Sequence, residues 1–124
     1  MGRCVWVAED DAELRRLLVA VLRKDGHRVR ELGDGEELWK ALSAVLGGPD
    51  APELVLSDQS MPRLSGIDVL RRLREAGAQL PFILITAFPS EETKSVAREH
   101  GARVLHKPFD LKVIREAVRA LAAA

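Results

Sequence analysis

Short apolar runs alternate with longer stretches of helical periodicity along the chain. The runs that predict strands are Cys4–Ala8, Val29–Leu32, Leu54–Ser57, Phe82–Thr86 and Arg103–Leu105. Three of these runs are almost continuously apolar, which is typical of parallel strands that helices cover on both faces. The pattern therefore predicts five strands in one sheet.

Apolar residues three or four positions apart predict a helix after each strand. The stripes are Leu14, Leu17, Leu18, Val21 and Leu22; Leu38, Leu42 and Val45; Val69, Leu70 and Leu73; and Leu111, Ile114, Val118 and Leu121. The stretch Ser90–Glu99 offers only Val96 and Ala97 for burial, so we expect the weakest and most mobile helix there. Fivefold alternation of strand and helix implies a parallel sheet with right-handed crossovers and helices on both faces.

Length and charge narrow the class of protein. A chain of 124 residues fits one domain, residues 1–124. Its 19 basic and 19 acidic residues cancel, so the domain lacks the field that direct binding to nucleic acid or anionic lipid would need. The start of the chain shows neither a charged leader nor a long apolar stretch, which favours a cytoplasmic protein outside the membrane.

Charged and hydroxyl side chains stand at the ends of four predicted strands. They are Glu9 and Asp10 after the first strand, Asp58 after the third, Thr86 at the end of the fourth and Lys107 after the fifth. In an open parallel sheet these ends converge on one crevice. Two carboxylates can hold a divalent cation, a third can act as nucleophile, and an ammonium and a hydroxyl can take up charge on phosphoryl oxygens. The combination predicts a site for phosphoryl transfer.

These motifs resemble those of the receiver domain of two-component response regulators, a family that includes the chemotaxis regulators. The matching elements are Glu9-Asp10-Asp11, Asp58-x-x-Met61-Pro62 with Gly66 eight residues after the aspartate, Thr86-Ala87 and Lys107-Pro108-Phe109. The resemblance covers Val5 to Leu121. It implies an α/β, flavodoxin-like, doubly wound (βα)5 fold with a five-stranded parallel sheet in the order 2-1-3-4-5.

The resemblance also implies a role for each site residue. Asp58 would accept a phosphoryl group from a histidine kinase or a histidine phosphotransfer protein, with Mg²⁺ or Mn²⁺ as cofactor. The implied metal ligands are Glu9, directly or through water, Asp10, Asp58 and the backbone carbonyl of Ser60. Thr86 and Lys107 would contact the phosphoryl oxygens. Three adjacent carboxylates should raise the pKa of at least one of them, unless a metal or the lysine relieves their repulsion.

The implied function is regulatory: self-phosphorylation and autodephosphorylation rather than turnover of a substrate. Phosphorylation would shift an equilibrium in the face built by the fourth helix, fifth strand and fifth helix, where a homodimer or a partner would bind. The last helix carries a second stripe that the core is not expected to need. Its residues are Val113, Ala117, Ala120 and Ala124.

The sequence departs from the family pattern at several positions. Val104 stands where an aromatic residue is usual, so the resemblance supports only the threonine half of the usual switch. Glu9 replaces the commoner aspartate. We expect Phe88 to cover the approach of a hydrolytic water to Asp58 and to prolong the acyl phosphate. The family commonly has a cis peptide bond at the position of Lys107–Pro108.

Two other classes of function stay open. One is an interaction module with the same fold but no response to phosphate, against which Asp58, Thr86 and Lys107 argue. The other is a Mg²⁺-dependent phosphatase or small-molecule enzyme, for which the sequence offers neither an Asp-x-Asp motif nor a Gly-rich phosphate loop. For a basic cluster in the third helical stretch and just before it, a solvated face is the favoured interpretation. The cluster consists of Arg63, Arg71, Arg72 and Arg74.

Overall fold

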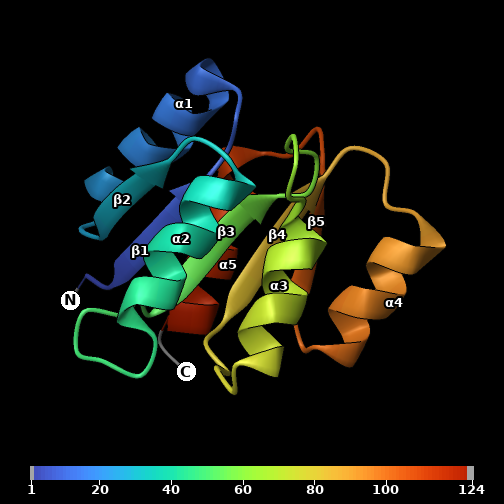
Figure 1. Cartoon of the computed structure of the whole chain (residues 1–124). Helices are drawn as coiled ribbons and strands as arrows, with labels where there is room; N and C mark the ends of the chain where they lie inside the picture. The colour runs from blue at the N-terminus through green and yellow to red at the C-terminus, as the bar shows by residue number, and fades with distance from the viewer. Residues whose placement is uncertain (1, 123–124) are drawn as a thin grey trace.

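The structure, a computed structural model, describes residues 2–122 and shows five parallel strands with a helix after each (Figure 1). The elements are β1 (Cys4–Ala8), α1 (Ala12–Lys24), β2 (Arg28–Leu32), α2 (Gly35–Val45), β3 (Leu54–Asp58), α3 (Gly66–Glu75), β4 (Phe82–Thr86), α4 (Glu91–Glu99), β5 (Arg103–His106) and α5 (Leu111–Ala122). The strand order is β2-β1-β3-β4-β5. The predicted flavodoxin-like, doubly wound architecture is confirmed.

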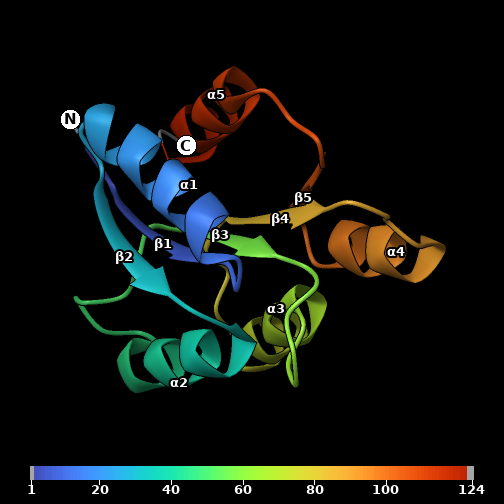
Figure 2. The ribbon, with the colours of Figure 1, turned by 90° about the horizontal axis from the view of Figure 1, so that it is seen from above.

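Helices cover both faces of the sheet. Figure 2 shows α1 and α5 on one face and α2 and α3 on the other, with α4 beside β5. Each strand contributes side chains to the cores on both faces of the sheet, because successive side chains of a strand point to opposite faces. Val5 and Val7 of β1 join the core beneath α1 and α5, whereas Trp6 and Ala8 join the core beneath α2 and α3.

Three strands reach one residue beyond their predicted bounds. β2 begins at Arg28, β3 ends at Asp58 and β5 ends at His106. Each extra residue lies opposite a strand residue: Arg28 opposite Cys4, Asp58 opposite Ile85, and His106 opposite Thr86. Pairing with the neighbouring strand decides where these strands begin or end, and the apolar pattern alone does not predict that pairing.

Side chains at the helix starts behave as their residue types predict. The Asp11 carboxylate accepts hydrogen bonds from the Glu13 and Leu14 amides at 3.0 and 3.2 Å. The Ser90 hydroxyl accepts from the Thr93 amide at 3.1 Å at the start of α4. Apart from Thr93, α4 buries only Val96 and Ala97, the two residues expected from its sequence.

The prediction of a second stripe on α5 is wrong at Ala117, which is fully buried. The reason is that α5 packs against both α1 and the sheet, so its buried arc is wider than the large apolar residues indicate. Val113 and Ala120 are exposed. Ala124 lies outside the described residues.

The interpretation of the arginine cluster as a solvated face is wrong for Arg74. Its guanidinium donates hydrogen bonds to the carbonyls of His100 and Ala78, both at 2.9 Å, and of Leu80 at 3.0 Å. It therefore ties α3 to the end of α4. Arg72 lies over the ring of Trp39 at 5.9 Å. Within residues 2–122, no helix is long and apolar enough to cross a membrane.

Candidate functional site

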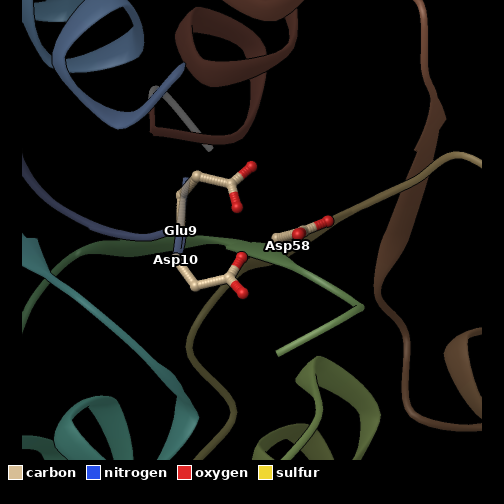
Figure 3. Close-up of side chains that lie close together, drawn as sticks. All are labelled: Glu9, Asp10 and Asp58. Carbon is tan, nitrogen blue, oxygen red and sulfur yellow. The ribbon is translucent and has the colours of Figure 1, made fainter. Parts of the chain in front are cut away.

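Three carboxylates meet at the carboxyl edge of the sheet. Glu9 and Asp10 follow β1, and Asp58 ends β3 (Figure 3). One carboxylate oxygen from each of the three residues lies within 4.8 Å of the others. Glu9 and Asp58 are almost fully buried, whereas Asp10 is exposed. The fold therefore brings the predicted acidic cluster together from residues up to 49 positions apart in sequence.

Strand register explains why these residues meet. β1 and β3 are neighbours, with Ala8 opposite Ser57, so the residues that follow both strands leave the sheet side by side. Thr86 ends β4, the next strand, and its hydroxyl-bearing side chain is buried. The backbone amide of Lys107 donates to the Thr86 carbonyl at 2.8 Å, which brings the start of the β5–α5 loop to the same edge.

Lys107 contacts both buried carboxylates. Its Nζ lies 3.1 Å from Glu9 Oε1 and 3.2 Å from Asp58 Oδ1. Burial alone would lower the pKa of Lys107, but the charges and hydrogen bonds of Asp58 and Glu9 outweigh it and raise the pKa. The lysine is therefore held in its charged form beside Asp58. The Lys107–Pro108 peptide bond is cis, as the family resemblance predicts.

The pKa of Glu9 is raised by its position in the cluster. Burial, followed by the hydrogen bond and negative charge of Asp58, raises its pKa to about 7, and Lys107 offsets only part of that rise. The expectation that Lys107 would prevent such a rise is wrong, since the pKa of Glu9 is raised although the lysine contacts it. A divalent cation would relieve the same repulsion, since crowded carboxylates are stabilised by nearby positive charge.

The loop between β3 and α3 carries Ser60, the exposed residue whose carbonyl was predicted as a ligand. The Gln59 side chain accepts the Ile67 amide at 2.8 Å, and the Gly66 amide donates to the Gln59 carbonyl at 3.1 Å. A Cβ on Gly66 would lie 2.7 Å from the Asp58 carbonyl oxygen and 2.4 Å from Leu84 Cδ1. Glycine is needed because α3 begins against the backbone of Asp58.

The expectation that Phe88 covers Asp58 is wrong. Its side chain is 92% exposed, because it lies on the loop between β4 and α4, which runs over the surface. Phe88 instead lines an apolar groove of about 530 Å³ beside Lys107. Leu14, Leu17, Ala87, Pro108, Phe109 and Leu111 line the rest of this groove.

Sequence reasoning missed Arg15, which lies beside the site. Its Nη1 donates to the Glu9 carbonyl at 2.7 Å, and its Nε pairs with Glu31 at 3.3 Å. The arginine thus links α1, the end of β1 and the edge strand β2. Its position in the first turns of a helix after an acidic motif was the only available signal, and surface arginines commonly occupy such positions.

A family model for the response regulator receiver domain matches residues 5–119. This chain therefore belongs to the response regulator receiver family, whose members are regulatory phosphoacceptors of two-component systems. It is 34% identical over 118 residues to the response regulator MprA of Mycolicibacterium vanbaalenii, covering 94% of this chain and 49% of that protein. It is 35% identical over 121 residues to the DNA-binding response regulator MtrA of Mycolicibacterium paratuberculosis, covering 97% of this chain and 51% of that protein.

The solved structures agree with this assignment. The receiver domain of Francisella response regulator 1452 superposes with a TM-score of 0.87 at 25% identity, covering 98% of both chains. The non-phosphorylated receiver domain of HemR from Leptospira biflexa gives a TM-score of 0.85 at 26% identity, covering 99% of this chain and 96% of the other. The chain spans about half the length of MprA and MtrA.

Proposed function

We propose that Asp58 accepts a phosphoryl group from a phosphohistidine of a histidine kinase or a histidine phosphotransfer protein. The observation that carries this proposal is the position of Lys107, whose ammonium lies 3.2 Å from Asp58 Oδ1. A buried carboxylate that already faces a fixed cation is arranged for the negative charge that a phosphoryl group brings. The buried hydroxyl of Thr86, at the end of the adjacent strand, supplies the second donor.

The chemical step needs little from the protein beyond position and charge. A carboxylate oxygen of Asp58 forms a bond to phosphorus while the bond from phosphorus to the imidazole nitrogen of the donor breaks. The imidazole leaves with the bonding electron pair and takes a proton from solvent. Lys107 stays close to Asp58 throughout and stabilises the charge on the phosphoryl oxygens, and Thr86 donates a hydrogen bond to one of them.

The acidic cluster fits Mg²⁺ or Mn²⁺. Three carboxylate oxygens within 4.8 Å of one another are hard ligands of the kind these cations prefer, and the negative charge of Asp58 adds to burial in raising the pKa of Glu9. We assign Glu9, Asp10, Asp58 and the Ser60 carbonyl as the residues that would hold the ion. When bound, the cation neutralises charge on the transferring phosphoryl group.

The response would be regulatory and would reach a partner through the surface of α4, β5 and α5. Two observations support this direction. Thr86 pairs with His106 of β5, so a displacement of Thr86 would act directly on that strand, and α4 buries few residues against its neighbours. A homodimer on this surface would use Val113 and Ala120 of α5, without Ala117. MtrA is named as DNA-binding, and about half of that protein lies outside the region that is similar to this chain.

Intact-mass measurement after incubation with acetyl phosphate and Mg²⁺ tests the proposal. We expect one acid-stable, base-labile phosphoryl adduct, absent from Asp58→Asn and retained in Asp50→Asn, a matched change at an exposed aspartate. An interaction module that does not respond to phosphate would give no adduct in the wild type or in either variant. A phosphatase would release phosphate through many turnovers without a stable adduct, and either result would refute the proposal.

Lys107→Ala supplies a second test. Because the ammonium is needed where negative charge accumulates, we expect slower adduct formation with unchanged circular dichroism. An unfolded variant would show that the lysine is structural.

A further inference from the structure

The loop between β3 and α3 contains a strained turn next to the candidate metal site. The Leu64 amide donates to the Pro62 carbonyl at 2.8 Å, which closes a three-residue turn centred on Arg63. Arg63 has a φ of 68°, and a turn of this kind with positive φ at its centre is rare and unfavourable for a residue with a Cβ. Something outside the turn must hold it in place.

The side chain of Arg63 contacts the first turn of α2 at two points. Its Nη2 lies 3.0 Å from Asp34 Oδ2, and its Nε lies 3.0 Å from Glu36 Oε2. Asp34 is itself fixed, because its Oδ1 accepts the Glu37 amide at 2.8 Å as the N-cap of α2. The planar guanidinium therefore joins the loop to a rigid helix start through two acceptors.

The backbones of the two segments also touch. A Cβ on Gly35 would lie 1.9 Å from the Leu64 carbonyl oxygen, so the loop rests directly on the start of α2. The same segment is linked to the acidic cluster from the other side, since the Glu9 amide donates to the carbonyl of Leu32, at the end of β2, at 3.2 Å. Arg63 thus closes a connection from the residue after β1 to the loop after β3.

We infer that Arg63 is a positioning residue for the metal site: its ion pairs with Asp34 and Glu36 hold the strained turn and so preset the Ser60 carbonyl before the cation binds. This inference rests on the proposed function, because it takes Ser60 as a ligand. Without the two ion pairs the turn relaxes, and ordering the loop then opposes cation binding.

Mg²⁺ titrations followed by amide NMR test the inference with Arg63→Asn and Glu36→Gln. Asparagine tolerates positive φ, so the first change removes the guanidinium while sparing the backbone. We expect the dissociation constant to rise about three- to tenfold for Arg63→Asn, below the roughly 10- to 100-fold loss typical of residues that orient metal ligands, because the pairs are partly exposed. The double variant should bind Mg²⁺ no more weakly than Arg63→Asn alone, because both substitutions disrupt the same contact between the loop and α2.

Arg3→Ala is the matched control, since Arg3 forms an ion pair with Glu53 at 3.3 Å at the opposite end of β1. It should bind Mg²⁺ like the wild type. The difference between the wild type and Arg63→Asn should shrink in about 1 M salt, where screening weakens the exposed pairs. Equal Mg²⁺ affinities for the wild type and Arg63→Asn, or additive losses in the double variant, would overturn the inference.

Hydrogen exchange without any metal separates this inference from the proposed function. We expect faster exchange at the Leu64 and Gly66 amides in Arg63→Asn than in the wild type, with unchanged exchange in β1. If the wild type binds no Mg²⁺, the proposed function fails whatever the exchange shows. If the wild type binds Mg²⁺ but exchange at these amides is unaffected by the substitution, the positioning role of Arg63 is refuted.

Discussion

The loops after β3 and β4 leave neighbouring strands at the same edge of the sheet, yet they are held very differently. The β3–α3 loop is tied by the Gln59 side chain at its base and by Arg63 at its tip, and it runs into a helix that buries Ile67, Val69, Leu70 and Leu73. The β4–α4 loop presents Phe88 to solvent and runs into a helix that buries Thr93, Val96 and Ala97.

This difference separates two tasks within one site. The side that carries Asp58 and the candidate ligand Ser60 is held in place by these contacts, which would lower the cost of ordering on binding of a cation or a phosphoryl group. The side that carries Thr86 is joined to the rest by fewer buried contacts, as expected for a segment that changes conformation. A response regulator needs both, since a rigid acceptor without a movable neighbour transmits nothing.

The largest predicted effect is on the β3–α3 side. Gly66→Ala should lower the free energy of unfolding by about 2–3 kcal/mol, because its Cβ would overlap the Asp58 carbonyl and Leu84. Gly101→Ala, at the end of α4, has open space around its Cβ and a φ of +70°, so only backbone strain of about 1 kcal/mol is expected. Urea unfolding measures both. A larger loss of unfolding free energy for Gly101→Ala than for Gly66→Ala would contradict the view that the β3–α3 side is the more tightly packed.

The second prediction concerns the metal. Asp10→Ala should weaken Mg²⁺ binding by about tenfold or more, and Glu9→Ala by less. Asp10 is exposed and available as a direct ligand, whereas Glu9 is already bound to Lys107 at 3.1 Å. Isothermal titration calorimetry ranks the two variants, and equal losses would show that Glu9 is as direct a ligand as Asp10.

The α1–α5 layer supplies a reference outside both loops. Arg115 donates to Asp25 at 2.6 and 2.9 Å, and this hydrogen bond lowers the pKa of Asp25. A carboxyl group with a lowered folded-state pKa stabilises the protein above its unfolded pKa near 3.8 and loses that contribution as the pH falls through the folded value. Asp25→Asn should therefore be less stable than the wild type at pH 7, with the gap closing below about pH 4. Thermal unfolding from pH 7 to pH 3 measures this, and a gap that does not narrow over that range would assign the loss to packing.

The smallest effect is expected on the β4–α4 side. Because the Phe88 side chain is 92% exposed, Phe88→Asn should change the free energy of unfolding by less than about 0.5 kcal/mol. The lifetime of the acyl phosphate, measured after removal of the phosphodonor, should stay close to that of the wild type. Much faster phosphate release in this variant would show that Phe88 closes over Asp58 once it is phosphorylated.

Local pattern was sufficient for most of the architecture. Periodicity predicted all five strands and helices, and Asp11 and Ser90 cap their helices as expected. The meeting of Glu9, Asp10 and Asp58 was also predictable, because the topology of a parallel sheet brings its carboxyl ends together whatever the details of packing. The expected mobility of α4 stays a prediction.

The sequence by itself determined the strand and helix pattern, the family and the candidate site residues, since each depends on residue type and short spacing. Only the tertiary structure decided that Ala117 is buried, that Phe88 is exposed, that Arg74 points inward and that Arg63 joins the loop to α2. It also decided that the pKa of Glu9 rises to about 7. These properties depend on which distant segments approach one another and how much water they exclude, and that information is absent from any local stretch of the chain.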